Sequence, residues 1–130
     1  MAEPRYRYLR VRVENDVLVM SVTPQELRST QFDMVEGLRE EMLAAADTTH
    51  AGKVVVDMSA VEQIGSASFR PLLSLRRKLH DCKGELLLCG LQPNVRDVFL
   101  VTRLIDNTGS QDAPFGAAAD VAAAVAKLNG

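Results

Sequence analysis

The order of the sequence patterns predicts an α/β fold, a sandwich with a mixed, mainly parallel central sheet of about four to five strands and about four helices. Two observations support this prediction. Near the N-terminus, a stretch with period-two alternation precedes a second short apolar strand, which indicates an antiparallel hairpin. Further along, two short apolar runs without alternation flank a stretch with helical spacing, which is typical of parallel strands buried on both faces.

The N-terminal hairpin is predicted over residues 5–22. In its first strand, apolar residues alternate with arginines and are expected to face the core: Leu9, Val11 and Val13. Residues 14–16, with the sequence Glu-Asn-Asp, are predicted to form the turn, and Val17–Val22 the second strand. Pro24 is expected to end that strand, because it cannot donate to a ladder of hydrogen bonds.

The middle of the chain is predicted to contain a helix from about residue 30 to 47 and then a strand–helix–strand unit over residues 53–89. In the first helix, apolar residues recur on one face: Phe32, Val35, Leu38, Met42 and Ala46. The unit has buried strands at Val54–Val56 and Leu86–Cys89. Its helix is expected to face the core with Phe69, Leu72, Leu73 and Leu79. Gly84 follows at a position suited to a left-handed helix cap.

The C-terminal part is predicted to add a helix, a short strand and a last helix. Pro93 can start the first of these helices, which would direct Val95, Val98 and Phe99 inward. Leu104 and Ile105 are predicted to form the short strand. Residues 115–128 are predicted to form the last helix, with Val121, Val125 and Leu128 aligned. Residues 1–130 are therefore expected to form a single domain.

Composition and charge limit the classes of function. With 47% hydrophobic and 25% charged residues, the chain is predicted to be a soluble globular protein. A formal net charge of −2 gives no indication of nucleic-acid binding. The absence of an 18-residue apolar stretch and of a signal-peptide core predicts a cytoplasmic protein without direct membrane insertion. Cys82 and Cys89 fit neither a disulfide framework nor a metal motif, and Cys89 is expected to be a small buried apolar residue.

Ser66 is the first candidate for chemistry, because it lies between a buried strand and the start of a helix. The surrounding Gly-Ser-Ala-Ser does not match the nucleophile elbow of hydrolases, and only His50 and His80 could act as a base. The sequence also has no phosphate loop, no dinucleotide glycine motif and no metal-ligand spacing, so we predict no catalytic residue, cofactor or metal. Two compatible interpretations of Ser66 stay open: a helix N-cap, or a phosphate acceptor at the positive end of the helix dipole.

Two segments resemble a known family. Val54–Ala67, with the sequence VVVDMSAVEQIGSA, is similar to the signature of the STAS domain, which anti-sigma factor antagonists and sulfate transporters share. That signature is a buried strand, then Asp-x-Ser-x-Val, then a hydrophobic residue and Asp-Ser-(Ser/Ala)-Gly at a helix start. Lys83–Val95 resembles the strand, turn and proline-started helix of the family, and the order of elements matches from about residue 5 to 128. The resemblance implies a STAS-like sandwich.

The resemblance also implies a mechanism of partner switching without enzymatic activity. An unphosphorylated antagonist binds a serine-kinase anti-sigma factor, the kinase phosphorylates the antagonist, and a phosphatase restores the complex. Ser66 matches the phosphoacceptor by position, and the partner-binding surface would comprise Arg28, Asp57, Gly65, Ser66, Ala67, Ser68 and Arg70. The alternative implied by the family is a scaffold that is not phosphorylated, or an accessory subunit, in a signalling or transport complex. Association with further copies of the chain is left open.

The sequence departs from the family pattern close to Ser66. Gly65 stands where the family has an acidic residue, and Ser68 stands where it has a glycine. Arg28 replaces an acid in the loop after the second strand. These changes are compatible with altered partner choice, slower phosphorylation or none. Pro71 predicts that Ser68 rather than Ser66 caps the helix, since proline is tolerated in the first turn.

Overall fold

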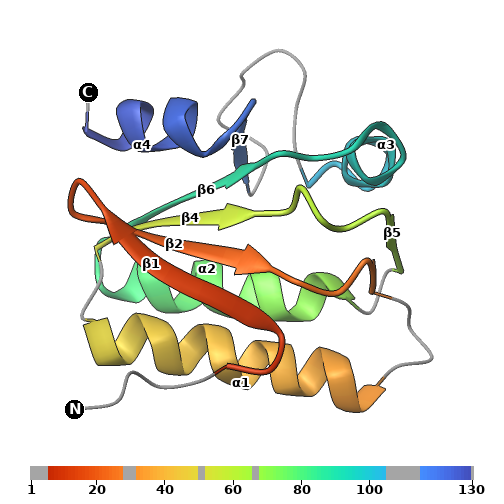
Figure 1. Ribbon diagram of the computed structural model, residues 1–130, viewed down its shortest axis with the longest axis horizontal. Coiled ribbons are helices and arrows are strands. Elements are labelled where there is room, and N and C mark those ends of the chain that lie inside the picture. Colours follow the sequence, from red (N-terminus) through yellow and green to blue (C-terminus); the bar gives the residue numbers. More distant parts are fainter. Residues whose placement is uncertain (1–5, 28–31, 50–51, 66–67, 105–114, 130) are drawn as a thin grey trace.

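The computed structural model describes residues 6–27, 32–49, 52–65, 68–104 and 115–129, in which helices cover both faces of a central five-stranded sheet (Figure 1). The strands of this sheet, in spatial order, are β1 (Leu9–Glu14), β2 (Val17–Val22), β4 (Lys53–Asp57), β6 (Glu85–Cys89) and β7 (Gly116–Ala118). The helices are α1 (Phe32–Thr49), α2 (Phe69–Asp81), α3 (Pro93–Val101) and α4 (Val121–Asn129). A separate two-stranded sheet pairs β3 (Glu26–Leu27) with β5 (Gln63–Ile64).

The central sheet is mixed and mainly parallel, as the sequence predicts. Only β1 and β2 run antiparallel, with Arg12 opposite Val19, whereas the pairs β2–β4, β4–β6 and β6–β7 are parallel. The turn between β1 and β2 has positive φ angles at both Asn15 (48°) and Asp16 (67°). Two such residues in succession give the turn that matches the right-handed twist of a hairpin, and Asn and Asp tolerate this conformation.

The sheet separates two apolar clusters, and β4 contributes to both. Val54, Val55 and Val56 are all fully buried, which confirms a strand covered on both faces. Val54 and Val56 pack in the larger cluster with α1, α2 and α3, and Val55 packs in the smaller cluster with α4. In Figure 1, α1 and α2 lie on one face of the sheet, α4 lies on the other, and α3 lies at the end near β5.

The helices of the larger cluster bury stripes at helical spacing. In α1 the predicted residues Val35, Leu38, Met42 and Ala46 are buried, and in α2 the stripe consists of Phe69, Leu72, Leu75 and Leu79, together with Pro71. The prediction of Leu73 as a core residue of α2 is wrong, since its side chain is 39% exposed. With 3.6 residues per turn, Leu75 rather than Leu73 continues the row that Phe69, Leu72 and Leu79 form.

The first strand is shorter than predicted and less buried at one end. It begins at Leu9 rather than at residue 5, and Val13, expected to face the core, is 62% exposed. Leu9 is buried and Val11 packs against the larger cluster, whereas Val13 lies close to the turn. Because β1 is an edge strand, only β2 covers it from the side, so its end beyond the helices remains open to solvent.

Two predictions for the C-terminal part are wrong. Leu104 is not in a strand, and its predicted partner Ile105 lies outside the described residues. The last strand is β7 at Gly116–Ala118, and the last helix begins at Val121 rather than at residue 115. The backbone N–H of Ala123 donates to Asp120 Oδ1 at 2.8 Å, which is the N-cap geometry that starts α4. The alanine-rich sequence favours a helix locally, but pairing with β6 overrides this preference at residues 116–118.

The end of α2 corrects a further prediction, because Lys83 and not Gly84 adopts the left-handed conformation, with φ of 59°. The N–H of Lys83 donates to the carbonyl of His80, and that of Gly84 donates to the carbonyl of Leu79, which is the Schellman pattern. Gly84 is required for a different reason. A Cβ atom at this position would lie 2.9 Å from the carbonyl oxygen of Gly52.

Candidate functional site

The candidate site is built around the segment that leads from the end of β4 to the start of α2. Hydrogen bonds from other elements hold this segment between Asp57 and Gln63. The N–H of Met58 donates to the carbonyl of Cys89 at 2.9 Å, so the segment leaves the sheet beside the end of β6. Further on, the N–H groups of Glu62 and Gln63 both donate to the carbonyl of Gln25, at 2.6 and 3.2 Å. The short parallel pairing of β5 with β3 continues this attachment.

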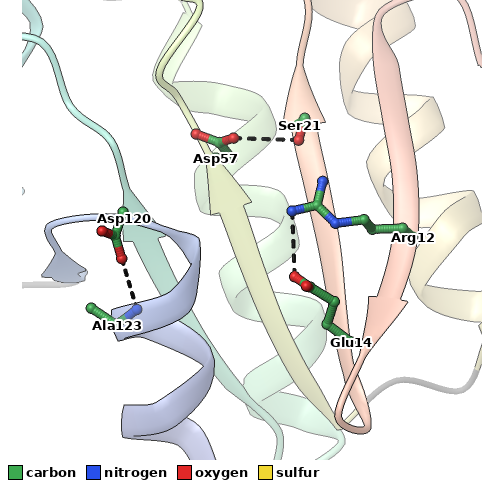
Figure 2. A network of polar contacts seen from close by, with 6 residues as sticks. All are labelled: Arg12, Glu14, Ser21, Asp57, Asp120 and Ala123. Carbon is green, nitrogen blue, oxygen red and sulfur yellow. Dashed lines mark hydrogen bonds and ion pairs between the residues drawn. The ribbon is translucent and has the colours of Figure 1, made fainter.

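Asp57, a predicted site residue, closes the β4 end of the segment. Its Oδ1 accepts a hydrogen bond from the N–H of Ser59 at 3.0 Å, and its Oδ2 accepts from the Ser21 hydroxyl at 3.4 Å. Figure 2 shows the second contact crossing from β4 to β2. The carboxylate therefore joins the sheet to the first turn of the segment, and hydrogen bonds to a charged acceptor are among the stronger ones.

Gly90 lets the chain after β6 approach this carboxylate closely. Its φ is +68°, in the left-handed region that favours glycine. A Cβ atom here would lie 2.9 Å from both Asp57 Oδ1 and Ser59 Cβ. The N–H of Gly90 donates to the carbonyl of Ala119 at 3.3 Å, which links the end of β6 to the residues before α4. Gly90 therefore allows the ends of three strands to pack side by side.

The start of α3 supports the same segment from the opposite side. The side-chain amide of Gln92 donates to the carbonyl of Ser59 at 2.8 Å, and that of Asn94 donates to the carbonyl of Glu62. Sequence reasoning assigned no role to Gln92, Asn94, Ser21 or Gly90. Gln92 and Asn94 flank Pro93 in the stretch that resembles the family. Their position beside a predicted helix start was the signal in the sequence that could have indicated a role.

At the start of α2, the structure describes some of the predicted site residues and not others. Gly65 is half-buried, and its carbonyl accepts from the N–H of Ser68 at 3.0 Å. Ser68 stands at the N-cap position with Pro71 in the first turn, as predicted. Its side chain, however, makes no capping hydrogen bond and is only 1% exposed, so it is covered by the protein. Arg28, Ser66 and Ala67 lie outside the described residues.

Arg70, the remaining predicted residue, is exposed on the first turn of α2. Its Nη1 lies 3.6 Å from Glu36 Oε1 on α1, and Glu36 Oε2 lies 3.9 Å from Arg39 Nη1. Arg39 also donates from Nε to the hydroxyl of Ser74 at 3.1 Å. Pairs this exposed are worth little stability, so they orient the two helices weakly and leave the Arg70 side chain, 65% exposed, accessible.

The described residues contain no group of three or more histidine, cysteine or acidic side chains that could hold a metal. Cys89 is buried, and burial, with smaller contributions from the carboxylates of Asp57 and Asp120, raises the pKa of its thiol to about 12. Such a thiol is not a nucleophile at neutral pH. Within the described part of the chain, no helix is both long and apolar enough to cross a membrane.

The model of the STAS domain family matches residues 8–115, which include the whole segment described above. The chain belongs to the STAS domain family.

Individual relatives agree with this assignment. BtrV of Bordetella bronchiseptica, which is named as an anti-sigma factor antagonist, is 37% identical over 67 residues, 52% of this chain and 57% of that protein. An anti-sigma factor antagonist from Mycobacterium paratuberculosis has a similar fold, with a TM-score of 0.73 and 23% identity over 94% of this chain and 93% of that one. SpoIIAA of Bacillus in its unphosphorylated form is also similar, with a TM-score of 0.65 and 19% identity over 94% and 98% of the two chains. The aligned segment thus spans little more than half the length of BtrV.

Proposed function

We propose that this chain is an anti-sigma factor antagonist that acts by partner switching and has no enzymatic activity. It would bind a serine-kinase anti-sigma factor in the unphosphorylated state and lose that partner when Ser66 is phosphorylated. The surface for the partner would be the predicted set, in which Ser68, only 1% exposed, would support its neighbours rather than contact the partner: Arg28, Asp57, Gly65, Ser66, Ala67, Ser68 and Arg70. The likeness to BtrV supports the class, and the existence of phosphorylated and unphosphorylated forms of SpoIIAA supports the switch.

The observation on which the proposal depends is the construction of the segment before α2. Five hydrogen bonds from three different parts of the chain hold its backbone: from Met58 to Cys89, from Glu62 and Gln63 to Gln25, from Gln92 to Ser59 and from Asn94 to Glu62. A segment held in this way loses little conformational entropy when a partner binds it. This preorganisation favours a binding surface.

Phosphorylation would act on such a surface through charge. A phosphoserine carries about −2 charge at neutral pH. If the group is buried in an interface without a cation to pair with, its desolvation costs several kcal/mol, enough to weaken binding by orders of magnitude. Arg70, four residues after Ser66 and largely exposed, is the nearest arginine along the chain that could instead pair with the phosphate within this protein.

Mapping of the phosphorylated residue by mass spectrometry tests the proposal. The purified chain is incubated with ATP and its cognate kinase, beside the variants Ser66→Ala and Ser59→Ala. Ser59 is the matched control, because it is exposed on the same segment. We expect phosphate on Ser66 in the wild type and in Ser59→Ala, and none in Ser66→Ala. An unmodified wild type, with binding retained in Ser66→Asp, would exclude the switch.

The second candidate function is a STAS scaffold that is never phosphorylated, in a signalling or transport complex. The replacement of acidic residues by Arg28 and Gly65 favours it, because both changes fall where the family is acidic. A stable assembly isolated from cells that lack the kinase, together with an unmodified Ser66, would support this candidate over the switch.

We also propose a cytoplasmic location, a phosphatase that reverses the modification, and no requirement for a cofactor or nucleic acid. Fractionation of cells, with detection of the native chain in the soluble fraction, tests the location.

A further inference from the structure

A groove of about 500 Å³ lies between α2 and the residues that follow α3. Phe69, Leu73 and Leu104 form its apolar part, and Arg70 and Arg77 contribute positive charge. Phe69 is buried and packs edge-on against Phe99 at 5.0 Å between ring centroids, so one wall of the groove is part of the rigid core. None of the residues that hold the segment before α2 by hydrogen bonds lines this groove.

One of the exposed apolar side chains of the protein lines this groove. Among the described residues, three large apolar side chains are exposed: Val13, Leu73 and Val101. Leu73 lines the groove, and Val101, 82% exposed, immediately precedes Thr102, another lining residue. Val101 itself does not line the groove, and Val13 lies on the edge strand β1. Exposed apolar surface bordered by charged groups is typical of a protein-binding site.

The charges of the groove follow the geometry of α2. Arg70, Leu73 and Arg77 stand at positions i, i+3 and i+7, on one side of the helix, and the rise of 1.5 Å per residue separates the two arginines by about 10.5 Å along its axis. Arg70 has one acidic neighbour, Glu36, at 3.6 Å. Within the described part of the chain, no carboxylate forms an ion pair with Arg77. A chain with a net charge of −2 thus presents an apolar strip between two cations.

We propose that this groove binds an amphipathic acidic helix of a partner protein. Such a helix, aligned with α2, would place leucine side chains on Leu73 and Leu104 and two carboxylates seven residues apart against Arg70 and Arg77. The spacing suits either direction of the partner helix, because the pattern of charge, apolar residue and charge is nearly symmetric. The groove shares only Arg70 with the surface proposed above, and no step requires Ser66 or a phosphate, so the inference goes beyond the proposed function and is tested separately through Arg77.

A synthetic helical peptide tests the proposal directly. It carries Glu at positions i and i+7 and Leu at i+3 and i+4, and a second peptide replaces both Glu by Lys. Binding to the full chain is measured by fluorescence anisotropy, and the contacted residues are mapped from backbone amide NMR shifts. Arg77→Glu is the test variant. Arg76→Glu is the matched control, since it changes the net charge equally and Arg76 borders a different depression, with Leu79, His80, Gly84 and Leu86.

We expect the acidic peptide to bind the wild type and Arg76→Glu with affinities within about twofold, and Arg77→Glu at least tenfold more weakly. The Lys peptide should bind the double variant Arg70→Glu/Arg77→Glu better than it binds the wild type, which shows charge complementarity even if single variants lose some stability. Equal weakening by Arg76→Glu and Arg77→Glu, equal binding of the two peptides, or shifts confined to residues outside α2 and residues 101–104 would overturn the proposal. Self-association that Leu73→Asp abolishes would assign the groove to a second copy instead.

Discussion

Substitution of Gly90 by alanine tests whether the close packing at the strand ends holds the segment before α2. An alanine in the left-handed region costs about 1–2 kcal/mol. In addition, its Cβ would lie 2.9 Å from Asp57 Oδ1 and from Ser59 Cβ, and 3.2 Å from the Ser59 nitrogen, so backbone as well as side chain must move. Overpacking of this kind typically costs about 1–3 kcal/mol. The two effects together predict a loss of about 2–5 kcal/mol in the free energy of unfolding.

Urea unfolding monitored by circular dichroism measures this loss, which corresponds to a decrease in Tm of roughly 7–18 °C for a chain of this length. Gly52→Ala is the control, because a Cβ atom there meets nothing within 4 Å. Restricting the unfolded chain at such an open position changes stability by less than about 1 kcal/mol and can increase it. A Gly90→Ala variant within about 0.5 kcal/mol of wild type would refute the close approach to Asp57 and Ser59.

Three further predictions concern the core, the thiols and the Asp57 carboxylate. Phe99 is fully buried between the rings of Phe69 and Phe115. Phe99→Ala should therefore lower the free energy of unfolding by about 3–5 kcal/mol in urea unfolding, and a loss below about 1 kcal/mol would contradict its place in the core. At pH 8 a thiol reagent should label Cys82 in the native protein and Cys89 only after unfolding, because a pKa of about 12 leaves about one Cys89 thiolate in ten thousand; rapid labelling of both would contradict the burial. Asp57→Ala should lower the free energy of unfolding by about 1.5–3 kcal/mol. Asp57→Asn should lower it by clearly less, because the side-chain carbonyl can still accept from the Ser59 N–H. Equal losses of the two variants in urea unfolding would show that this hydrogen bond is unimportant.

The strands and helices with strong apolar patterns could be predicted from the sequence. Val54–Val56 and the run at residues 86–89 lack alternation because both of their faces are covered. The continuous apolar sequence therefore predicts these buried strands directly. The strand at Gly116–Ala118 has no such signal. Gly116 lies against Leu87, whose Cδ2 would be 2.7 Å from a Cβ atom at this position. Only the pairing with β6 makes this segment a strand, and local propensity cannot predict that pairing.

The candidate site, too, could be predicted from the sequence only in part. The motif at residues 54–67 located the segment and named Asp57, since the order of strand, polar turn and helix start is local. The amides of Gln92 and Asn94 reach carbonyls more than thirty residues away, so their role depends on how α3 packs against the segment. Leu73 was assigned to the core for a related reason. Apolar character at near-helical spacing predicts burial, whereas the contacts of the folded chain leave this side chain in the groove of α2.

The affinity of the chain for its anti-sigma kinase, measured with Ser66 unmodified and with Ser66 phosphorylated, tests the central claim most directly. Isothermal titration of the two forms against the same kinase preparation, with nucleotide held constant, gives the ratio of the dissociation constants. We expect the phosphorylated form to bind at least tenfold more weakly, a difference of about 1.4 kcal/mol or more in binding free energy. Equal affinities of the two forms would contradict partner switching through Ser66.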